Sequence, residues 1–398
     1  MSSSREPTSR LKPLFLLLMC CSLLLLSACW DRVEVNDIVF VLGAGLHETE
    51  DGMIELSIEM VLPQQEVGAD AEADSELSTY VEAAEGRTIM DAIANLQQKV
   101  PRELFWGQMS TTIISESLAE SGMQRAMDFL ARHPGARLRK HIFITQEDPV
   151  EIFSTAPHLE QSASDTMKEL ARMQLGIEVD ILELLKAMDE ESIDIAVPLI
   201  ETTPIGQGKN EKQDLQINGA AIIKQGHMTN TINMKATRGV LWLKDEVEET
   251  IVTISPEDVE GRLTMKMAQS STSFTPEIHN GKWRLHIYAK SEDDIFENAS
   301  HLDPGDPDTI AMLEQELAAE IKERMELALQ IIQKDIQADV FHFGEIFRRH
   351  YPDQWKEAKL HWDEIYPEIE VNIEVETTVN RPGMTVEPIG IPKGEVEE

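Results

Sequence analysis

The stretch IVFVLGAGLHETEDGMIELSIEMVL, residues 38–62, decides how the folded body begins. Its first five residues are apolar and mostly β-branched or aromatic, which favours a strand. Asp51-Gly52 is a hairpin turn signal. After the turn, apolar residues fill every second position from Ile54 to Leu62, with Glu55, Ser57, Glu59 and Val61 between them. This period of two predicts a β-hairpin whose second strand buries one face.

Helix and strand signals alternate downstream of this hairpin. Residues 63–76 are small and acidic and predict an exposed loop. The patterns after it predict, in order, a helix at 88–96, a strand at 109–115, a helix at 117–132, a strand at 138–145 and helices within 150–193. Gly43-Ala44-Gly45 lacks a third glycine and precedes no helix, so it indicates a tight strand end and not a nucleotide loop.

The second half of the chain begins after a Pro- and Gly-containing charged stretch at 201–214. Strands are expected at 217–224, 229–234, 239–243, 250–254, 263–268 and 283–289. Asp303–Asp308 then opens a long helix whose apolar residues recur at steps of three and four. A helical stretch through Trp355 and Trp362 follows, and a final strand at 369–379 alternates apolar residues with glutamates.

The first 29 residues resemble an export signal. Arg5, Arg10 and Lys12 precede an apolar run, Leu14–Leu26, that is shorter than the ~20 residues a membrane span needs. Leu26-Ser27-Ala28-Cys29 is a lipobox, in which small residues let a peptidase cut between Ala28 and Cys29. We expect Cys29 to carry a diacylglyceryl thioether, with N-acylation as a further modification.

These patterns predict an α+β fold of several domains, in which mixed sheets pack against helices and the C-terminal domain holds a long helix. The expected organisation is a signal peptide at 1–28, an N-terminal α+β region at 29–200, a linker at 201–214, a C-terminal α+β domain at 215–380 and a flexible tail at 381–398. Cys20, Cys21 and Cys29 are the three cysteines, so the mature chain keeps one thiol and forms no internal disulfide.

Charge excludes one class of partner. The chain has 35 basic and 72 acidic residues, a formal net charge of −37. Proteins that bind nucleic acid neutralise phosphates with basic patches, so nucleic acid is not an expected ligand. The same charge argues against a polybasic grip on anionic lipid.

No catalytic or metal-binding motif emerges from the sequence. A G-x-S-x-G elbow, H-E-x-x-H and C-x-x-C are all lacking. The acidic run at 303–308 lacks the order of a calcium loop and indicates helix capping. We interpret His342, His350 and His361 as ordinary buried or surface histidines and not as metal ligands. Asn298-Ala299-Ser300 matches the glycosylation sequon, but we expect no glycosylation there because a lipoprotein of this kind is bacterial. We therefore expect no enzyme activity, no cofactor and no metal.

Several segments together resemble the Ger(x)C spore-germination lipoproteins, the C subunits of nutrient germinant receptors. The matching segments are Cys29–Glu34, Phe105–Gln108 with Ile113–Ala119 and Met127–Pro134, Gly219–Lys224 with Thr237–Trp242, and Phe343-Gly344 with Tyr351–Trp355 and Trp362. They run from residue 29 to about 380. The sequence departs from many relatives at Gln108, where histidine is expected, and at Ile222, where an aromatic residue is common.

This resemblance implies an α+β fold of about three domains and a non-enzymatic receptor subunit, lipid-anchored on the outer face of the spore inner membrane. Its implied partners are two membrane-embedded subunits of A type and B type. The alternative is a solute-binding lipoprotein of an ABC importer, whose members usually show repeated βα units around a cleft with aromatic ligand groups. Only 5% of the residues are aromatic and the strands at 217–289 suggest an antiparallel series, which favours the receptor subunit.

Overall fold

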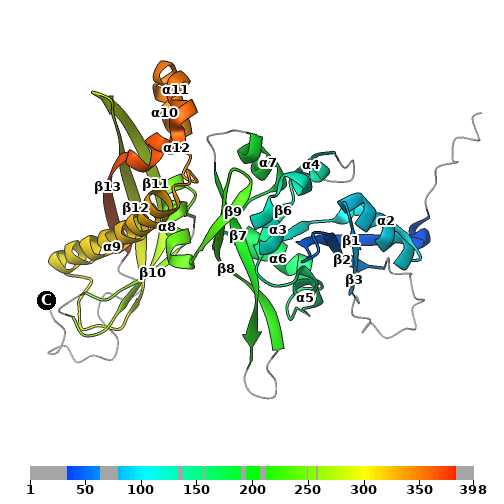
Figure 1. Cartoon of the computed structure of the whole chain (residues 1–398). Coiled ribbons are helices and arrows are strands. Elements are labelled where there is room, and N and C mark those ends of the chain that lie inside the picture. The colour runs from blue at the N-terminus through cyan, green and yellow to red at the C-terminus, as the bar shows by residue number, and fades with distance from the viewer. Residues whose placement is uncertain are drawn as a thin grey trace, which may run out of the picture.

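The computed structural model describes residues 34–62, 79–132, 138–155, 157–189, 194–206, 212–248, 250–256 and 259–381. Figure 1 shows an elongated molecule with the first strands at one end and the C-terminal sheet at the other. The described strands form two mixed sheets, one of nine strands and one of four, with helices packed on them. This confirms the predicted α+β class with mixed sheets. No helix among the described residues is long and apolar enough to cross a membrane.

The predicted hairpin starts the larger sheet. After the short 3-10 turn Val35–Asp37, β1 (Ile38–Glu48) pairs antiparallel with β2 (Ile54–Val61), and β2 pairs with β3 (Thr79–Gly86). The expected single wet face of β2 is wrong, because Ser57 and Glu59 are 2% and 0% exposed. The strand is covered on both sides, since helices pack on each face of the sheet.

The glycines at 43 and 45 lie inside β1 and do not end it, which corrects the tight strand end expected there. A Cβ on Gly43 would lie 2.3 Å from Ser164 Oγ and 2.6 Å from the Phe153 ring. Glycine is therefore required because later helices approach the strand backbone directly.

The sheet continues with strands parallel to β1. The helix expected at 88–96 is α2 (Ile89–Lys99), and the Thr88 side chain caps it by accepting from the Asp91 N–H. β4 (Glu103–Phe105) pairs with the start of β1, and after a 3-10 turn (Trp106–Gln108), β5 (Thr111–Ser115) pairs parallel with its second half. β6 (His141–Thr145) lies parallel to β5.

The helix expected at 117–132 is two helices, α3 (Glu116–Ser121) and α4 (Gln124–Arg132). Gly122 ends α3 at a φ of 126°, and its N–H donates to the Leu118 carbonyl. Because this backbone region favours glycine, the chain turns there and starts a second helix. The helical region after β6 divides similarly into α5 (Pro149–Ser154), α6 (Ala163–Arg172) and α7 (Ile181–Asp189).

The expected linker at 201–214 is strand wherever it is described, apart from the single residue Gly206. β7 (Ile195–Ile205) and β8 (Lys212–Lys224) form a long antiparallel hairpin, and β9 (His227–Ile232) completes the sheet. β6 and β7 are joined by one residue pair, Ile144 with Leu199. The narrow connection in the larger sheet thus lies before β7. Of the turn-favouring residues in 201–214, Pro204 lies within β7 and Gly206 directly follows that strand.

The strand expected at 239–243 is wrong, because these residues belong to α8 (Met234–Lys244). Asn233 caps this helix by accepting from the Ala236 N–H. A Cβ on Gly239 would lie 2.1 Å from the Arg324 carbonyl oxygen of the next long helix. The apolar run that resembled a strand is therefore a buried helix with a glycine at a helix crossing.

The second sheet has the order β10 (Ile251–Ile254), β11 (Leu263–His279), β12 (Lys282–Asn298) and β13 (Glu370–Arg381). β11 and β12 are much longer than the predicted strands and join at Asn280-Gly281, with φ of 51° and 77°. The first three strands are antiparallel, whereas β13 lies parallel to β12. The final strand was predicted correctly.

The predicted long helix is confirmed as α9 (Pro307–Ala328) continued by the π-helical segment Leu329–Ile336. Its apolar stripe, including Leu313, Leu317 and Ile321, is buried in the core, and α9 contacts α8 and β13. The C-terminal helical stretch is α10 (Phe343–His350), α11 (Pro352–Ala358) and α12 (Trp362–Ile365), with 3-10 turns at Lys359–His361 and Tyr366–Glu368.

Candidate functional site

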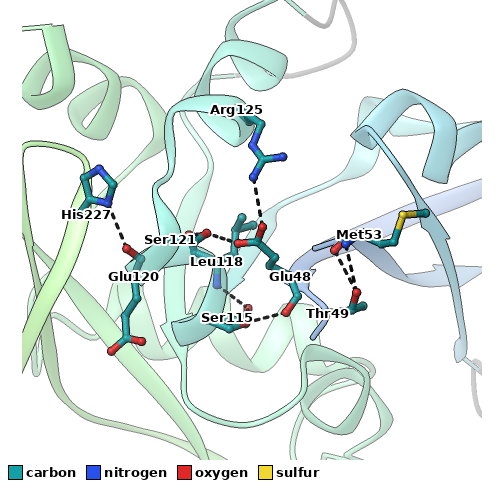
Figure 2. Close-up of polar contacts among 10 residues, drawn as sticks. Glu48, Thr49, Met53, Ser115, Leu118, Glu120, Ser121, Arg125 and His227 are labelled. Carbon is teal, nitrogen blue, oxygen red and sulfur yellow. Dashed lines mark hydrogen bonds and ion pairs between the residues drawn. The ribbon is translucent and has the colours of Figure 1, made fainter. Parts of the chain in front are cut away.

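Polar side chains gather where β1 ends against α3 and α4 (Figure 2). The Glu48 carboxylate accepts from the Ser121 hydroxyl and forms an ion pair with Arg125 at 3.2 Å. His227 of β9 lies with its Nδ1 3.1 Å from the Glu120 carbonyl oxygen. The carboxyl ends of parallel strands are the usual ligand-binding edge of an α/β sheet. Here the Glu48 carboxylate is already paired with Arg125 and Ser121. We therefore interpret the cluster as a contact that holds the end of β1 against α3 and α4.

One contact in this region has the residue types of a nucleophile and its base. Ser117 Oγ lies 3.2 Å from His47 Nδ1 and also 3.1 Å from the Glu48 carbonyl oxygen. A serine hydroxyl has one proton, and the carbonyl oxygen can only accept it. When Ser117 donates this proton to the Glu48 carbonyl oxygen, the proton points away from the His47 imidazole. We therefore interpret the contact between Ser117 and His47 as structural and not as a nucleophile with its base.

A buried carboxylate network connects the two halves of the molecule, and we call it the junction. Asp339, which lies between the π-helical segment and α10, accepts from Phe343 N at 2.9 Å, Gly344 N at 2.8 Å and Trp362 Nε1 at 2.9 Å. Its own N–H donates to Asp194 Oδ2 at 2.9 Å. Asp194 directly precedes β7. Asp339 therefore holds the start of α10 and Trp362 of α12, and Asp194 binds the Asp339 backbone to the larger sheet.

The junction aspartates lie in an environment that disfavours their charge. Burial raises the pKa of Asp339 to about 7, opposed by its three N–H donors. Burial also raises the pKa of Asp194 to about 6, opposed by the Asp339 N–H and by nearby Lys224 and reinforced by Asp363. Lys224 Nζ donates to the Gln337 carbonyl oxygen at 2.6 Å, which adds a second link across the same boundary.

Aromatic rings surround the junction. Trp362 meets Trp355 edge to face at 4.9 Å and Trp283 of β12 at 5.8 Å. Trp283 also meets Phe347 at 4.7 Å. These rings exclude water from Asp339 and attach α10, α11 and α12 to the second sheet.

A cleft of about 500 Å³ lies beside the junction, between α7 on one side and α8 and α10 on the other. Its lining carries charges of both signs, from the carboxylates of Glu178, Asp180, Glu183, Glu246 and Glu345 and the cations of Lys186, Lys244 and Arg348. His342 also lines this cleft. Burial and nearby Lys244 lower the pKa of His342 to about 4, so this imidazole is neutral at pH 7. Its Nε2 is buried without a hydrogen-bond partner among the described residues.

The structure places the predicted site residues as follows. Ala28 and Cys29, the cleavage and lipidation positions, lie outside the described residues, as do the signal peptide and the segment 382–398. His350 Nδ1 contacts the Ile346 carbonyl oxygen and His361 lies 3.9 Å from Glu364, so these histidines do not converge with His342. Within the described ranges no group of three His, Cys, Asp or Glu side chains could hold a metal ion.

The acidic run at 303–308 caps α9, as predicted. Asp306 accepts from the Thr309 N–H at 2.9 Å, and Asp303 accepts from the Gly305 N–H at 2.7 Å. Sequence reasoning missed the junction, although one signal was present. Asp194 and Asp339 each adjoin apolar segments, IAVPLI and VFHF, where an acidic residue is unusual unless it is buried with partners.

Two family models match the chain in succession. "Spore germination protein N-terminal domain" matches residues 31–202, and "Spore germination B3/ GerAC like, C-terminal" matches residues 218–383. The boundary between them falls in the β7–β8 hairpin.

Full-length relatives agree with the models. The chain is 27% identical to the putative spore germination protein YfkR of Bacillus subtilis, covering 94% of this chain and 97% of that protein. It is 24% identical to spore germination protein KC of the same organism, covering 95% and 98%. The crystal structure of the GerBC protein has the same fold, with a TM-score of 0.52 at 16% identity over 85% of this chain and 97% of that one. The chain therefore belongs to the GerAC/GerBC-like family of spore germination receptor C subunits, which are not enzymes.

Proposed function

We propose that this chain is the lipid-anchored C subunit of a nutrient germinant receptor, held at the outer face of the spore inner membrane through Cys29. It acts by assembly with two membrane-embedded subunits, of A type and B type, and not by chemistry of its own. The observation that supports the anchor most strongly is the position of Cys29 relative to the start of the family match. The family match begins at residue 31, two residues after the lipobox cysteine, so residues 1–28 precede the family region as a removable signal would.

The fold supports a scaffolding role. The junction and its aromatic rings join the two halves through buried hydrogen bonds, so the body behaves as one extended unit. The first strands, closest in sequence to Cys29, lie at one end of that unit. Anchoring at this end holds the second sheet away from the membrane, where it is free to meet other parts of the receptor.

The anchor is tested by the substitution Cys29→Ala, with Cys21→Ala as the matched control. Both remove one thiol, but Cys21 is expected to leave with the signal peptide. The Cys29→Ala chain should be lost from the spore inner-membrane fraction, and the two partner subunits should no longer co-purify with it. Cys21→Ala should behave as wild type. Normal localisation, co-purification and germination of Cys29→Ala spores would overturn the proposal.

A further inference from the structure

The end of the larger sheet where the described chain enters exposes several large apolar side chains. We call this surface the entry end; it comprises the start of β1, the end of β2 with Leu62, the start of β3, and β4. Leu62, Tyr80 and Phe105 are 38%, 50% and 42% exposed there. Exposed apolar groups gathered at one place usually mark a contact surface.

The strand register brings these residues to the same level of the sheet. Phe40 is the Cα partner of both Val61 and Phe105, so β1, β2 and β4 meet at this point. The Phe40 and Phe105 rings lie edge to face at 5.8 Å. Tyr80 is the partner of Met60, one position along from Val61. The apolar groups therefore share one end of the sheet, with Phe105 on the same face as Phe40 and Tyr80 on the opposite face.

The expected lipid lies a short tether away from this surface. Nine residue-to-residue steps along the chain separate Cys29 from Ile38, the first residue of β1. Even fully extended, they span only about 30 Å at ~3.3–3.6 Å per residue. The entry end is also the end of the molecule opposite the second sheet (Figure 1). A lipid on Cys29 thus confines Leu62, Tyr80 and Phe105 to the neighbourhood of the headgroups.

We infer that the entry end is a membrane-contact surface, with Tyr80, Phe105 and Leu62 resting in the interface of a neutral phospholipid bilayer. The inference rests on the proposed lipidation of Cys29. Aromatic side chains favour the headgroup region, and a lipid chain reinforced by a second contact anchors more firmly than a lipid chain alone. Neutral lipid is favoured because Glu34, Asp37 and Glu103 are exposed beside the patch and the linking segment 63–78 has five acidic residues.

The cysteine content of the chain makes this contact measurable. Because the mature protein has no thiol besides the lipidated Cys29, Tyr80→Cys and Phe105→Cys each introduce one reactive site. Phe296→Cys is the matched control, since Phe296 is 70% exposed on β12 of the second sheet. Each lipidated variant is labelled with a polarity-sensitive fluorophore and reconstituted into phosphatidylcholine vesicles that contain headgroup-level spin-labelled lipid.

The labels at 80 and 105 should shift to shorter wavelength and lose fluorescence to the spin label, whereas the label at 296 should do neither. Adding phosphatidylglycerol should reduce the loss at 80 and 105, and an equal or greater loss would overturn neutral lipid as the occupant. Equal behaviour at all three sites would overturn the contact. Tyr80 packs less tightly than Phe105, so its variant keeps the test open if Phe105→Cys fails to fold.

Mass spectrometry of the N-terminal peptide separates this inference from the anchor on which it rests. If Cys29 carries no lipid, the proposed anchor itself fails. If Cys29 is lipidated and the vesicles bind the protein, but the labels at 80 and 105 remain in water, only the membrane-contact surface fails.

Discussion

The backbone N–H of Asp339 donates to the carboxylate of Asp194 at 2.9 Å, joining residues 145 positions apart. Both side chains are buried, at 2% and 8% exposure. One end of this hydrogen bond belongs to the segment that leads into α10, and the other to the residue directly before β7. The cohesion of the two halves therefore depends on groups whose protonation changes within an ordinary range of pH.

The junction should make the protein less stable as pH rises from about 4 to about 7. Burial raises the pKa of Asp339 to about 7 and of Asp194 to about 6, above the value of 3.8 for an unperturbed aspartate. Between these values the two aspartates hold more protons in the folded state than in the unfolded state, so their contribution to the free energy of unfolding falls with increasing pH. The contribution is fully present below pH ~4 and is lost above the folded-state pKa values.

Urea unfolding of the mature Cys29→Ala chain at pH 4.5, 6 and 7.5 measures this dependence. Asp339→Asn should make the free energy of unfolding fall less steeply between these pH values, because one of the two titrating carboxyl groups of the junction is removed. Asp353→Asn, which changes an exposed carboxylate with 87% of its side-chain area in water, should leave the slope unchanged. A slope as steep in Asp339→Asn as in the parent would contradict the assignment.

The indole N–H of Trp362 should add to the free energy of unfolding through its hydrogen bond to Asp339, in addition to the packing of the ring. Trp362→Phe removes the donor to Asp339 Oδ2 and leaves a buried carboxylate with one partner fewer. We expect a loss of about 1–3 kcal/mol in the free energy of unfolding. Trp355→Phe is the matched control, because it shortens a neighbouring ring of the same cluster without removing a bond to Asp339. Equal losses in the two variants would assign the effect to packing alone.

Gly239→Ala should destabilise the protein although alanine is the better helix former. In an exposed helix the change would gain up to about 1 kcal/mol. In α8 the new Cβ would meet the Arg324 carbonyl at 2.1 Å and the Ala328 Cβ at 2.8 Å, so α9 must move. We expect a net loss of about 1–3 kcal/mol, measured by urea unfolding. Gly176→Ala, whose nearest contact is a side-chain methyl at 3.3 Å, should change little; a comparable loss there would refute the crossing as the cause.

The sequence correctly predicted the turns, helix caps and strands that are specified by residues close to one another in the chain. The Asp51-Gly52 turn, the acidic cap of α9 and the alternation of β13 each lie within a few residues of the structure they specify. These predictions held because turn and cap preferences act through hydrogen bonds between residues two to four positions apart.

Signals that depend on distant packing were misread. The apolar run at 239–243 is compatible with either a buried strand or a buried helix. The structure has a helix there, and its Gly239 packs directly against the Arg324 carbonyl group of α9. Residues 201–214 have linker composition, but pairing of β7 with β8 makes most of them strand. The lipobox predicts Cys29 from four adjacent residues. The contact between Asp194 and Asp339 is not predicted in this way, because these residues are 145 positions apart and meet only after the halves fold.

Glu59 provides the sharpest test of such long-range packing, because its position in an alternating strand predicted a solvated side chain. Instead it is fully buried, and its two carboxylate oxygens accept the N–H groups of Ala163 at 2.9 Å and Ser164 at 2.8 Å, at the start of α6. Burial raises its pKa, and the two N–H donors oppose that rise. Glu59→Gln replaces one acceptor with an amide group that faces an N–H, so we expect a loss of about 1–3 kcal/mol in urea unfolding.

The control for this prediction lies on the same strand. Glu55→Gln makes the same chemical change four residues earlier, where the side chain is only partly buried and caps no helix. It should alter stability by less than about 0.5 kcal/mol. Amide hydrogen exchange locates the effect, since Glu59→Gln should speed exchange at Ala163 and Ser164 and leave α2 unchanged. If the two substitutions cost the same, the carboxylate of Glu59 does not hold α6 on the sheet, and the glycines of β1 must position that helix alone.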